Sequence, residues 1–178
     1  YQLRAIPRLI LEKNLFGLDI DDRAAQLAAF ALIMKARADD RRLFQEAPKL
    51  NVLSLQDSKG MSVDELAAHL APFGLTRASL KLVLESFEHA KTFGSLVQIH
   101  TELVAQLATL SAGLHQALRE GDLYARQAAK DILPLLRQAS VLGMRFDAVV
   151  ANPPYMGSKV MSPPLKAFTK KNYPDSKA

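Results

Sequence analysis

Near the start of the chain, two apolar segments that close on polar or acidic residues flank one long helical pattern. The segments "NLFGLDID" at 14–21 and "KLNVLSLQDS" at 49–58 have the length and composition of short β-strands. Residues 23–38 between them are rich in alanine, leucine, isoleucine and methionine, which predicts a helix that is apolar over most of its surface and deeply packed. Asp21 or Asp22 is placed to cap that helix. A strand–helix–strand order favours two parallel strands and therefore an α/β fold.

The pattern changes to helices alone over residues 59–142. Ser62 with Glu65 forms a capping box ahead of an apolar run, and long amphipathic segments follow. A connection of about eighty residues between two strands of one sheet is far longer than an ordinary loop. We therefore interpret 59–142 as a helical insertion that can also grip a partner, with 1–58 and 143–178 as the parts of the sheet on either side.

The most informative segment is "FDAVVANPPYMG", in which an apolar run at 146–151 is followed by Asn152, Pro153, Pro154 and Tyr155. Proline cannot donate to a sheet ladder, so the run is predicted to be a strand that stops there. An exocyclic amine on a flat base is a poor nucleophile because its lone pair is delocalised into the ring. The side-chain oxygen of Asn152 and the fixed carbonyl of Pro153 can accept the two amine hydrogens, which frees that lone pair, and Tyr155 can stack on a flipped base. The tetrapeptide resembles the Asn-Pro-Pro-Tyr motif of amino-methyltransferases and makes these four residues catalytic candidates; the alternative is a strand-ending turn with a packed tyrosine.

Acidic residues at the ends of the two early strands are candidates for cofactor binding. A carboxylate at the carboxyl end of a strand, such as Asp19, can accept both hydroxyls of a ribose, as the acid of S-adenosylmethionine enzymes does. Ile20 beside it can pack on the face of an adenine. After the next strand, Gln56 or Asp57 can reach the adenine amine, and we include Asp57 in the predicted site. The alternatives are local ones, in which Asp19 caps the following helix and Asp57 is only a polar strand end.

The charge balance favours a polyanionic partner, since the 178 residues carry a formal net charge of +5 and a pI near 9.5. Lys159, Lys166, Lys170 and Lys171 cluster after the motif and are candidates for phosphate contacts, or else form a solvated basic face. The chain has no cysteine, which excludes thiolate metal sites and fits the cytoplasm, and its four histidines lack the close pairing that a metal site needs. We therefore expect no metal, and the short apolar runs lead us to expect no membrane partner.

Four segments taken together resemble one family: "IPRLILEKNLFGLDIDDRAAQLAAFALIMKARADDR", "FEHAKTFGSLVQI", "FDAVVANPPYMG" and "LKAFTKKNYPDSK". They cover most of the chain and resemble the adenine-specific DNA methyltransferases of BREX phage-defence systems, the PglX type. The resemblance implies an α/β fold in which a partial Rossmann-like S-adenosylmethionine methyltransferase sheet is interrupted by the helical insertion. It also implies N6-adenine methylation of double-stranded DNA with S-adenosylmethionine in the bacterial cytoplasm, as a mark of host DNA. Other proteins of the defence system are the further partners that it implies.

The chain departs from that family in ways that bear on its activity. It has no Gly-x-Gly pattern, whereas such enzymes carry a glycine-containing cofactor motif on the strand before "GLDID". The family's sequence also continues beyond the catalytic loop, so the resemblance implies an internal fragment that is inactive alone and binds the cofactor weakly or not at all. One alternative is a helical DNA- or protein-binding module with a degenerate methyltransferase shell. Another is methylation of RNA or of protein glutamine, because the tetrapeptide itself does not distinguish these substrates.

Overall fold

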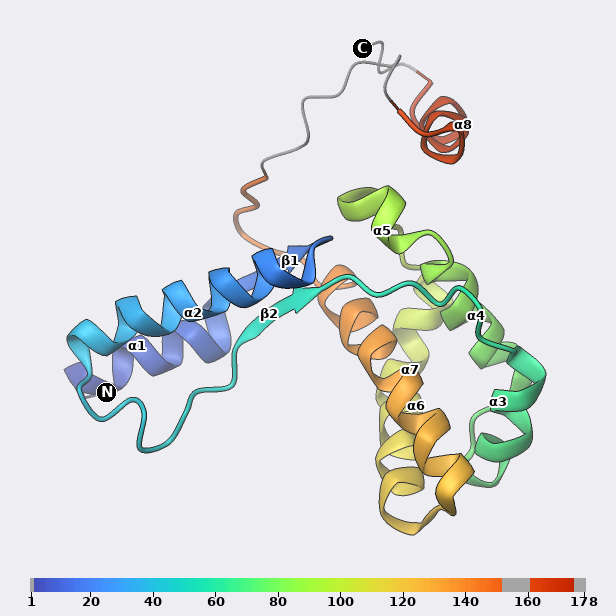
Figure 1. The fold of residues 1–178 in the computed structure, drawn as a ribbon, viewed down its shortest axis with the longest axis horizontal. Helices are drawn as coiled ribbons and strands as arrows, with labels where there is room; N and C mark the ends of the chain where they lie inside the picture. The colour runs from blue at the N-terminus through green and yellow to red at the C-terminus, as the bar shows by residue number, and fades with distance from the viewer. Residues whose placement is uncertain (1, 152–160, 175–178) are drawn as a thin grey trace.

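The computed structural model describes residues 2–151 and 161–174. Figure 1 shows the two strands with the first helices at one end of the molecule and the helices of residues 63–142 at the other. The elements are, in chain order, η1 (Leu3–Ala5), α1 (Ile6–Leu9), the π-helix η2 (Ile10–Asn14), β1 (Phe16–Asp19), α2 (Asp22–Asp39), β2 (Asn51–Ser54), α3 (Val63–Leu70), η3 (Ala71–Phe73), α4 (Arg77–Phe87), α5 (Ala90–Phe93), η4 (Gly94–Leu96), α6 (Thr101–Glu120), α7 (Leu123–Leu142) and α8 (Pro163–Asn172).

The strands β1 and β2 form a parallel pair, as the strand–helix–strand pattern predicts. Phe16 lies opposite Asn51, and Asp19 lies opposite Ser54. The backbone N–H of Leu55 donates to the carbonyl of Asp19 at 2.7 Å, which continues the pairing just past the ladder. Both strands therefore end together, and the residues that follow them share one carboxyl edge of the sheet.

Helix starts follow the local signals in the sequence. Asp21 is the N-cap of α2, and its Oδ1 accepts the backbone N–H groups of Arg23 and Ala24 at 2.7 and 3.0 Å. Ser62 caps α3 in the same way, with its Oγ accepting the N–H of Glu65 at 3.3 Å. Each side chain satisfies donors that the first helical turn leaves unpaired, which fixes the residue at which the helix begins.

Helix α2 has the predicted position but is not deeply packed. Ala25 and Ala36 are its buried residues, whereas Leu27 and Phe30 are 67% and 60% exposed. Met34 continues this exposed apolar stripe, one turn after Phe30. The prediction of deep packing was wrong because a two-stranded sheet and one short helical segment cannot cover a helix that is apolar on most sides. Sequence periodicity reports an apolar surface and not what lies against it.

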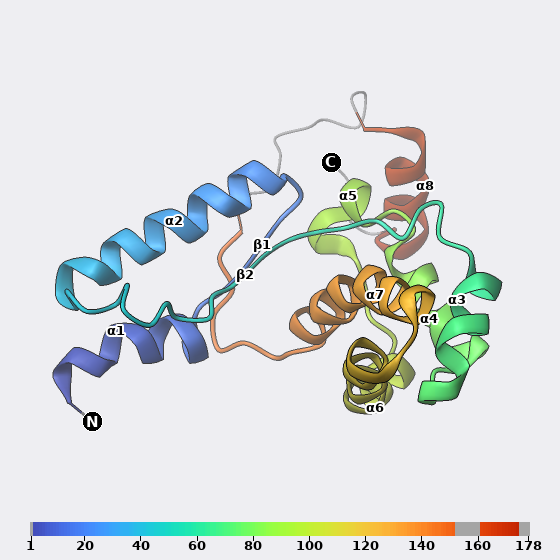
Figure 2. The same cartoon turned by 60° about the horizontal axis from the view of Figure 1, so that its bottom comes forward.

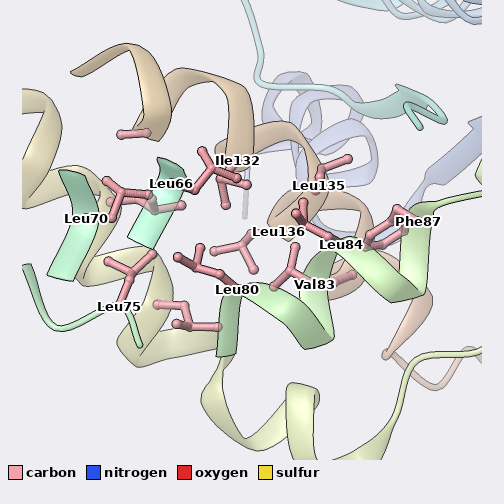
Figure 3. Packing of buried hydrophobic residues seen from close by; sticks show 14 of the residues in the cluster. Leu66, Leu70, Leu75, Leu80, Val83, Leu84, Phe87, Ile132, Leu135 and Leu136 are labelled. Atoms are coloured by element: carbon pink, nitrogen blue, oxygen red, sulfur yellow. The ribbon is translucent and has the colours of Figure 1, made fainter. Parts of the chain in front are cut away.

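The main apolar core lies within the helices of residues 63–142. Helices α6 and α7 are connected through Gly121 and Asp122, and α3 and α4 pack against them (Figure 1). Figure 3 shows part of this core, where side chains from α3, α4 and α7 meet. The labelled residues are Leu66, Leu70, Leu75, Leu80, Val83, Leu84, Phe87, Ile132, Leu135 and Leu136. This helical block, defined here as residues 59–142, thus buries a core of its own, and its standing as an insertion remains an interpretation.

The segment 146–151 does not form the predicted strand. Its residues run as irregular chain with one bend, and Val149 and Val150 are 77% and 97% exposed. The ring of Phe146 packs on that of Phe16 in β1, with ring centroids 5.4 Å apart. A strand requires a hydrogen-bonded neighbour, and within the part of the chain that the structure describes the sheet consists of β1 and β2 alone. The segment is apolar, as the sequence shows, but it forms no ladder with β1 or β2.

Candidate functional site

The carboxyl end of β1 presents an acid and an apolar side chain together. Asp19 is exposed, and its Oδ1 accepts the backbone N–H of Asp21 at 2.9 Å. Ile20, the next residue, is 49% exposed. Asp21 and not Asp19 is the cap of α2, so the local alternative for Asp19 does not apply. Among the described residues the second carboxylate oxygen of Asp19 has no donor, which leaves it able to accept a hydroxyl.

The carboxylate of Asp57 is engaged with the helical block. Its Oδ1 accepts the backbone N–H of Lys91, in the first turn of α5, at 2.8 Å. His89, the residue that precedes α5, makes no side-chain cap, so Asp57 supplies that function from a distant part of the sequence. A cofactor role for Asp57 stays a prediction. Because Oδ1 is bonded to Lys91, a contact with the cofactor would use Oδ2.

Asp22 is the most connected side chain at this edge. Its Oδ1 accepts from Gln56 Nε2 at 2.7 Å, and its Oδ2 lies 3.1 Å from the ammonium of Lys91. Gln56 Nε2 also lies 2.9 Å from the hydroxyl of Ser54. Hydrogen bonds from Ser54, Gln56 and Lys91, in that order of size, lower the pKa of Asp22 to about 2. The carboxylate is therefore ionised at neutral pH and carries a fixed negative charge beside Asp19.

Sequence reasoning missed this network. It treated Asp22 as a possible helix cap and gave Lys91 no role, because the two residues lie 69 positions apart. The one available signal was the acidic run in "GLDIDD": adjacent carboxylates at one sheet edge need a cation nearby, and a lysine from elsewhere in the chain is the usual source.

A buried glutamine joins the sheet edge to the core of the helical block. Gln138 in α7 is 1% exposed, and its Nε2 donates to the carbonyl of Gln56 at 3.3 Å. Its Oε1 accepts the N–H of the same residue. Ser58 is also buried, and its hydroxyl donates to the carbonyl of Leu84 in α4 at 2.5 Å. The polar segment after β2 is thus fixed to two helices of the block by buried hydrogen bonds, which are costly to break.

The predicted catalytic residues Asn152, Pro153, Pro154 and Tyr155, and the predicted phosphate contact Lys159, lie outside the described residues. The other three lysines of the predicted DNA contact belong to α8, where all are exposed: Lys166, Lys170 and Lys171. Figure 2 shows α8 beside α5 of the helical block. The structure therefore places the helix that carries these lysines against α5, and their contact with phosphate stays a prediction.

A hollow lies elsewhere, on the helical block between α3 and α7. It has a volume of about 480 Å³, and its lining includes the stacked rings of His69 and Tyr124 together with Glu65 and Asp131. No residue of the predicted site lines it. Within residues 2–151 and 161–174, no three histidine or acidic side chains gather closely enough to hold a metal ion. Nor does any helix among those residues have the length and apolar content to cross a membrane.

A parallel strand pair joined by a helix, with an exposed acid at its carboxyl edge, is consistent with a fragment of an α/β methyltransferase domain. Residues 13–178 match the family model described as Eco57I restriction-modification methylase, and the chain belongs to this family.

Two curated relatives align with the whole chain. The "Adenine-specific methyltransferase BrxX" of Escherichia coli O9:H4 (strain HS) is 44% identical over 199 residues, covering 100% of this chain and 16% of the relative. The "Adenine-specific methyltransferase PglX" of Lacticaseibacillus casei (strain Zhang) is 31% identical over 183 residues, covering 100% and 15%. These names confirm the resemblance inferred from the sequence. The chain spans about a sixth of the length of either relative.

Replacing Asp22 by asparagine is expected to remove an acid-sensitive contribution to folding. The folded-state pKa of Asp22 is about 2 and its ordinary value is 3.8, so the carboxylate stabilises the fold fully above pH 3.8. That contribution is lost as the pH falls from about 4 to about 2, because the unfolded chain then binds the proton first. The free energy of urea unfolding, measured across this window, should fall more steeply for the wild-type chain than for Asp22→Asn. The control is Asp39→Asn, at the other end of α2, whose free energy of unfolding should depend on pH as that of the wild-type chain does. The same pH dependence for the wild-type chain and Asp22→Asn would contradict the prediction.

Proposed function

We propose that this chain is part of an adenine-specific DNA methyltransferase that transfers a methyl group from S-adenosylmethionine to N6 of an adenine flipped out of duplex DNA. The observation that carries the proposal is the exposed pair Asp19 and Ile20 at the carboxyl edge of β1. Ligands of open α/β sheets bind at this edge. The chain belongs to a methylase family and contains the tetrapeptide at 152–155 that amine activation requires.

The edge fits the adenosine part of the cofactor. Asp19 can accept a ribose hydroxyl on its Oδ2 while its Oδ1 stays bonded to the backbone N–H of Asp21. Ile20 offers an apolar surface for an adenine ring. Lys91 offsets the charge of Asp22 next to this position, which lowers the negative charge that Asp19, Asp21 and Asp22 together place at the edge. The bound cofactor supplies an electrophilic methyl group on a positively charged sulfur.

The remaining chemistry falls to the tetrapeptide. Asn152 Oδ1 and the carbonyl of Pro153 accept the two hydrogens of the adenine amine, and the nitrogen lone pair is then available to attack the methyl carbon. Pro154 restricts the backbone after the carbonyl, and Tyr155 stacks on the extruded base. As the new nitrogen–carbon bond forms, the bond between the methyl carbon and the cofactor's sulfur would break and leave that sulfur neutral, and N6 would release one of its protons to solvent.

The relatives' names support adenine as the target and BREX defence as the setting. In that setting the methyl group marks host DNA, other proteins of the system are partners, and the enzyme acts in the bacterial cytoplasm. Lys159 and the α8 residues Lys166, Lys170 and Lys171 contact phosphates near the flipped nucleotide, a role for which exposed lysines are suited.

Asn152→Ala in the full-length polypeptide is expected to lower methyl transfer to adenine in duplex DNA by about 100-fold or more. Loss of one preorganised polar group at a reacting centre has effects of this size. Transfer of labelled methyl from S-adenosylmethionine is the measurement. The matched control is Asn14→Ala, an exposed asparagine at the end of η2, which should transfer at the wild-type rate.

The same assay separates the alternatives. DNA binding without methyl transfer by the wild-type protein, with its partner proteins present, would favour the non-catalytic module with a degenerate methyltransferase shell. Transfer to RNA or to protein glutamine in place of duplex DNA would move the substrate to another class. Lys170→Ala should weaken DNA binding without abolishing transfer at saturating DNA.

Asp19→Asn in the full-length polypeptide is expected to raise the KM for S-adenosylmethionine by about tenfold or more, with a smaller effect on kcat. A hydrogen bond to a charged partner contributes about 1.5–3 kcal/mol, and the amide has half the acceptor capacity of the carboxylate. Initial rates at varied cofactor concentration provide the test. Asp39→Asn, which removes an exposed carboxylate far along α2, should leave the KM unchanged; an equal KM for Asp19→Asn would exclude the ribose role.

Residues 1–178 alone are expected to show no saturable heat with S-adenosylmethionine in a calorimetric titration. The chain contains no Gly-x-Gly loop to approach the methionine end of the cofactor, so only the adenosine contacts are available. The full-length polypeptide, titrated under the same conditions, should bind. A clear saturable heat from the 178 residues would show that the adenosine edge is sufficient.

A further inference from the structure

Two aromatic contacts hold the described chain on either side of the tetrapeptide segment. Before it, the ring of Phe146 packs on Phe16 of β1, with centroids 5.4 Å apart and planes tilted by 58°. After it, Phe168 of α8 stacks on Phe93 of α5, with centroids 4.2 Å apart and planes 23° from parallel. The first contact joins the chain before the tetrapeptide to β1. The second contact joins the helix after the tetrapeptide to the helical block.

Helix α5 is itself fixed at the carboxyl edge of the sheet. Lys91 is bound twice, through its backbone N–H to Asp57 and through its ammonium to Asp22. The turn that follows passes over the cofactor strand: a Cβ placed on Gly94 would lie 3.4 Å from Cγ2 of Ile20. Phe93 therefore directly precedes a residue whose backbone lies close to the side chain of Ile20.

The contact between α5 and α8 extends beyond one ring pair. Gln98 Nε2 donates to the hydroxyl of Tyr173 at 3.2 Å, just past the end of α8. The ring of His89 packs edge-on against Phe93, and the ring of Tyr173 lies beside that of Phe168. Figure 2 shows the two helices side by side, with α5 the nearer of the two to the end of β1. Phe93, Phe168 and Tyr173 are half-buried, and Phe93 also packs against the main core of the helical block.

We propose that Phe93 and Phe168 are positioning residues for the amine-activating tetrapeptide at 152–155. Their stack fixes the chain that follows the tetrapeptide against α5, and α5 is fixed to the edge that carries Asp19 and Ile20. The helical block thereby sets the distance between the cofactor's methyl group and the target amine. This inference rests on the proposed methyltransferase function and assigns the block a role in catalysis that differs from gripping DNA.

The test uses the full-length polypeptide and separates kcat from KM. Phe93→Ala and Phe168→Ala should each lower kcat for adenine methylation about 10- to 100-fold, because a displacement of about 1 Å at a reacting centre has effects of this order. The KM for S-adenosylmethionine should change less than about threefold, since the cofactor contacts remain. Phe93→Tyr, which keeps the ring, should restore kcat, and the double variant Phe93→Ala/Phe168→Ala should lose little more than either single variant.

The matched control is Tyr124→Ala, which removes an aromatic ring stacked on His69 elsewhere in the helical block. Its kcat should equal the wild-type value. Hydrogen exchange of residues 163–172 provides a readout independent of activity and should become faster in Phe93→Ala but not in Tyr124→Ala. If Phe93→Ala proves unstable, Phe168→Ala reports on the same contact from α8.

Each of the following outcomes would contradict the positioning role of Phe93 and Phe168. An unchanged kcat with faster exchange in α8 would show a contact without a positioning role. A raised cofactor KM at unchanged kcat would place Phe93 in the cofactor site instead. Unchanged exchange in both alanine variants would mean that the contact does not form in solution. Absence of transfer by the wild-type protein would refute the proposed function itself, and the positioning role with it.

Discussion

The carboxylate of Asp22 is the point where the separate parts of the described chain meet. It follows β1 directly, accepts a hydrogen bond from Gln56 after β2, and pairs with Lys91 from the helical block. Charge-assisted bonds of this kind are stronger than neutral ones, and three donors on one carboxyl group restrict its position. The placing of Asp19 and Ile20 against α5 therefore depends on a side chain that is not itself part of the predicted site.

Local structure could be predicted from the sequence, whereas the meeting of distant segments could not. The strands, the α2 cap at Asp21 and the α3 cap at Ser62 depend on residues within a few positions of one another. Burial of α2 and pairing of 146–151 depend on what lies opposite, and neither periodicity nor composition contains that information. The same reasoning applies to the candidate site: the position of Asp19 at a strand end could be predicted from neighbouring residues, while Lys91 became relevant only through a partner 69 residues away.

The helical block was interpreted from sequence as an insertion whose natural use is to hold a partner. Several of its described contacts bind it to the rest of the chain. Gln138 and Ser58 bind it to the segment after β2, Lys91 binds it to the start of α2, and Phe93 contacts the helix that follows the tetrapeptide. A segment with these contacts is integrated in the architecture of the domain, whatever surface it also offers to DNA or to other proteins.

The buried contact of Gln138 with Gln56 has a consequence for the order in which the molecule assembles. It joins positions 82 residues apart, whereas α6 and α7 follow each other directly through Gly121 and Asp122. Contacts near in sequence close quickly, and distant ones wait for longer loops to be ordered. The helical hairpin is therefore the early structure, and the strands, although made first on the ribosome, reach their final place only after α7 has emerged. Until then the segment after β2 lacks the helices to which Gln138 and Ser58 bind it, so the final position of the earlier half depends on the later half of the chain.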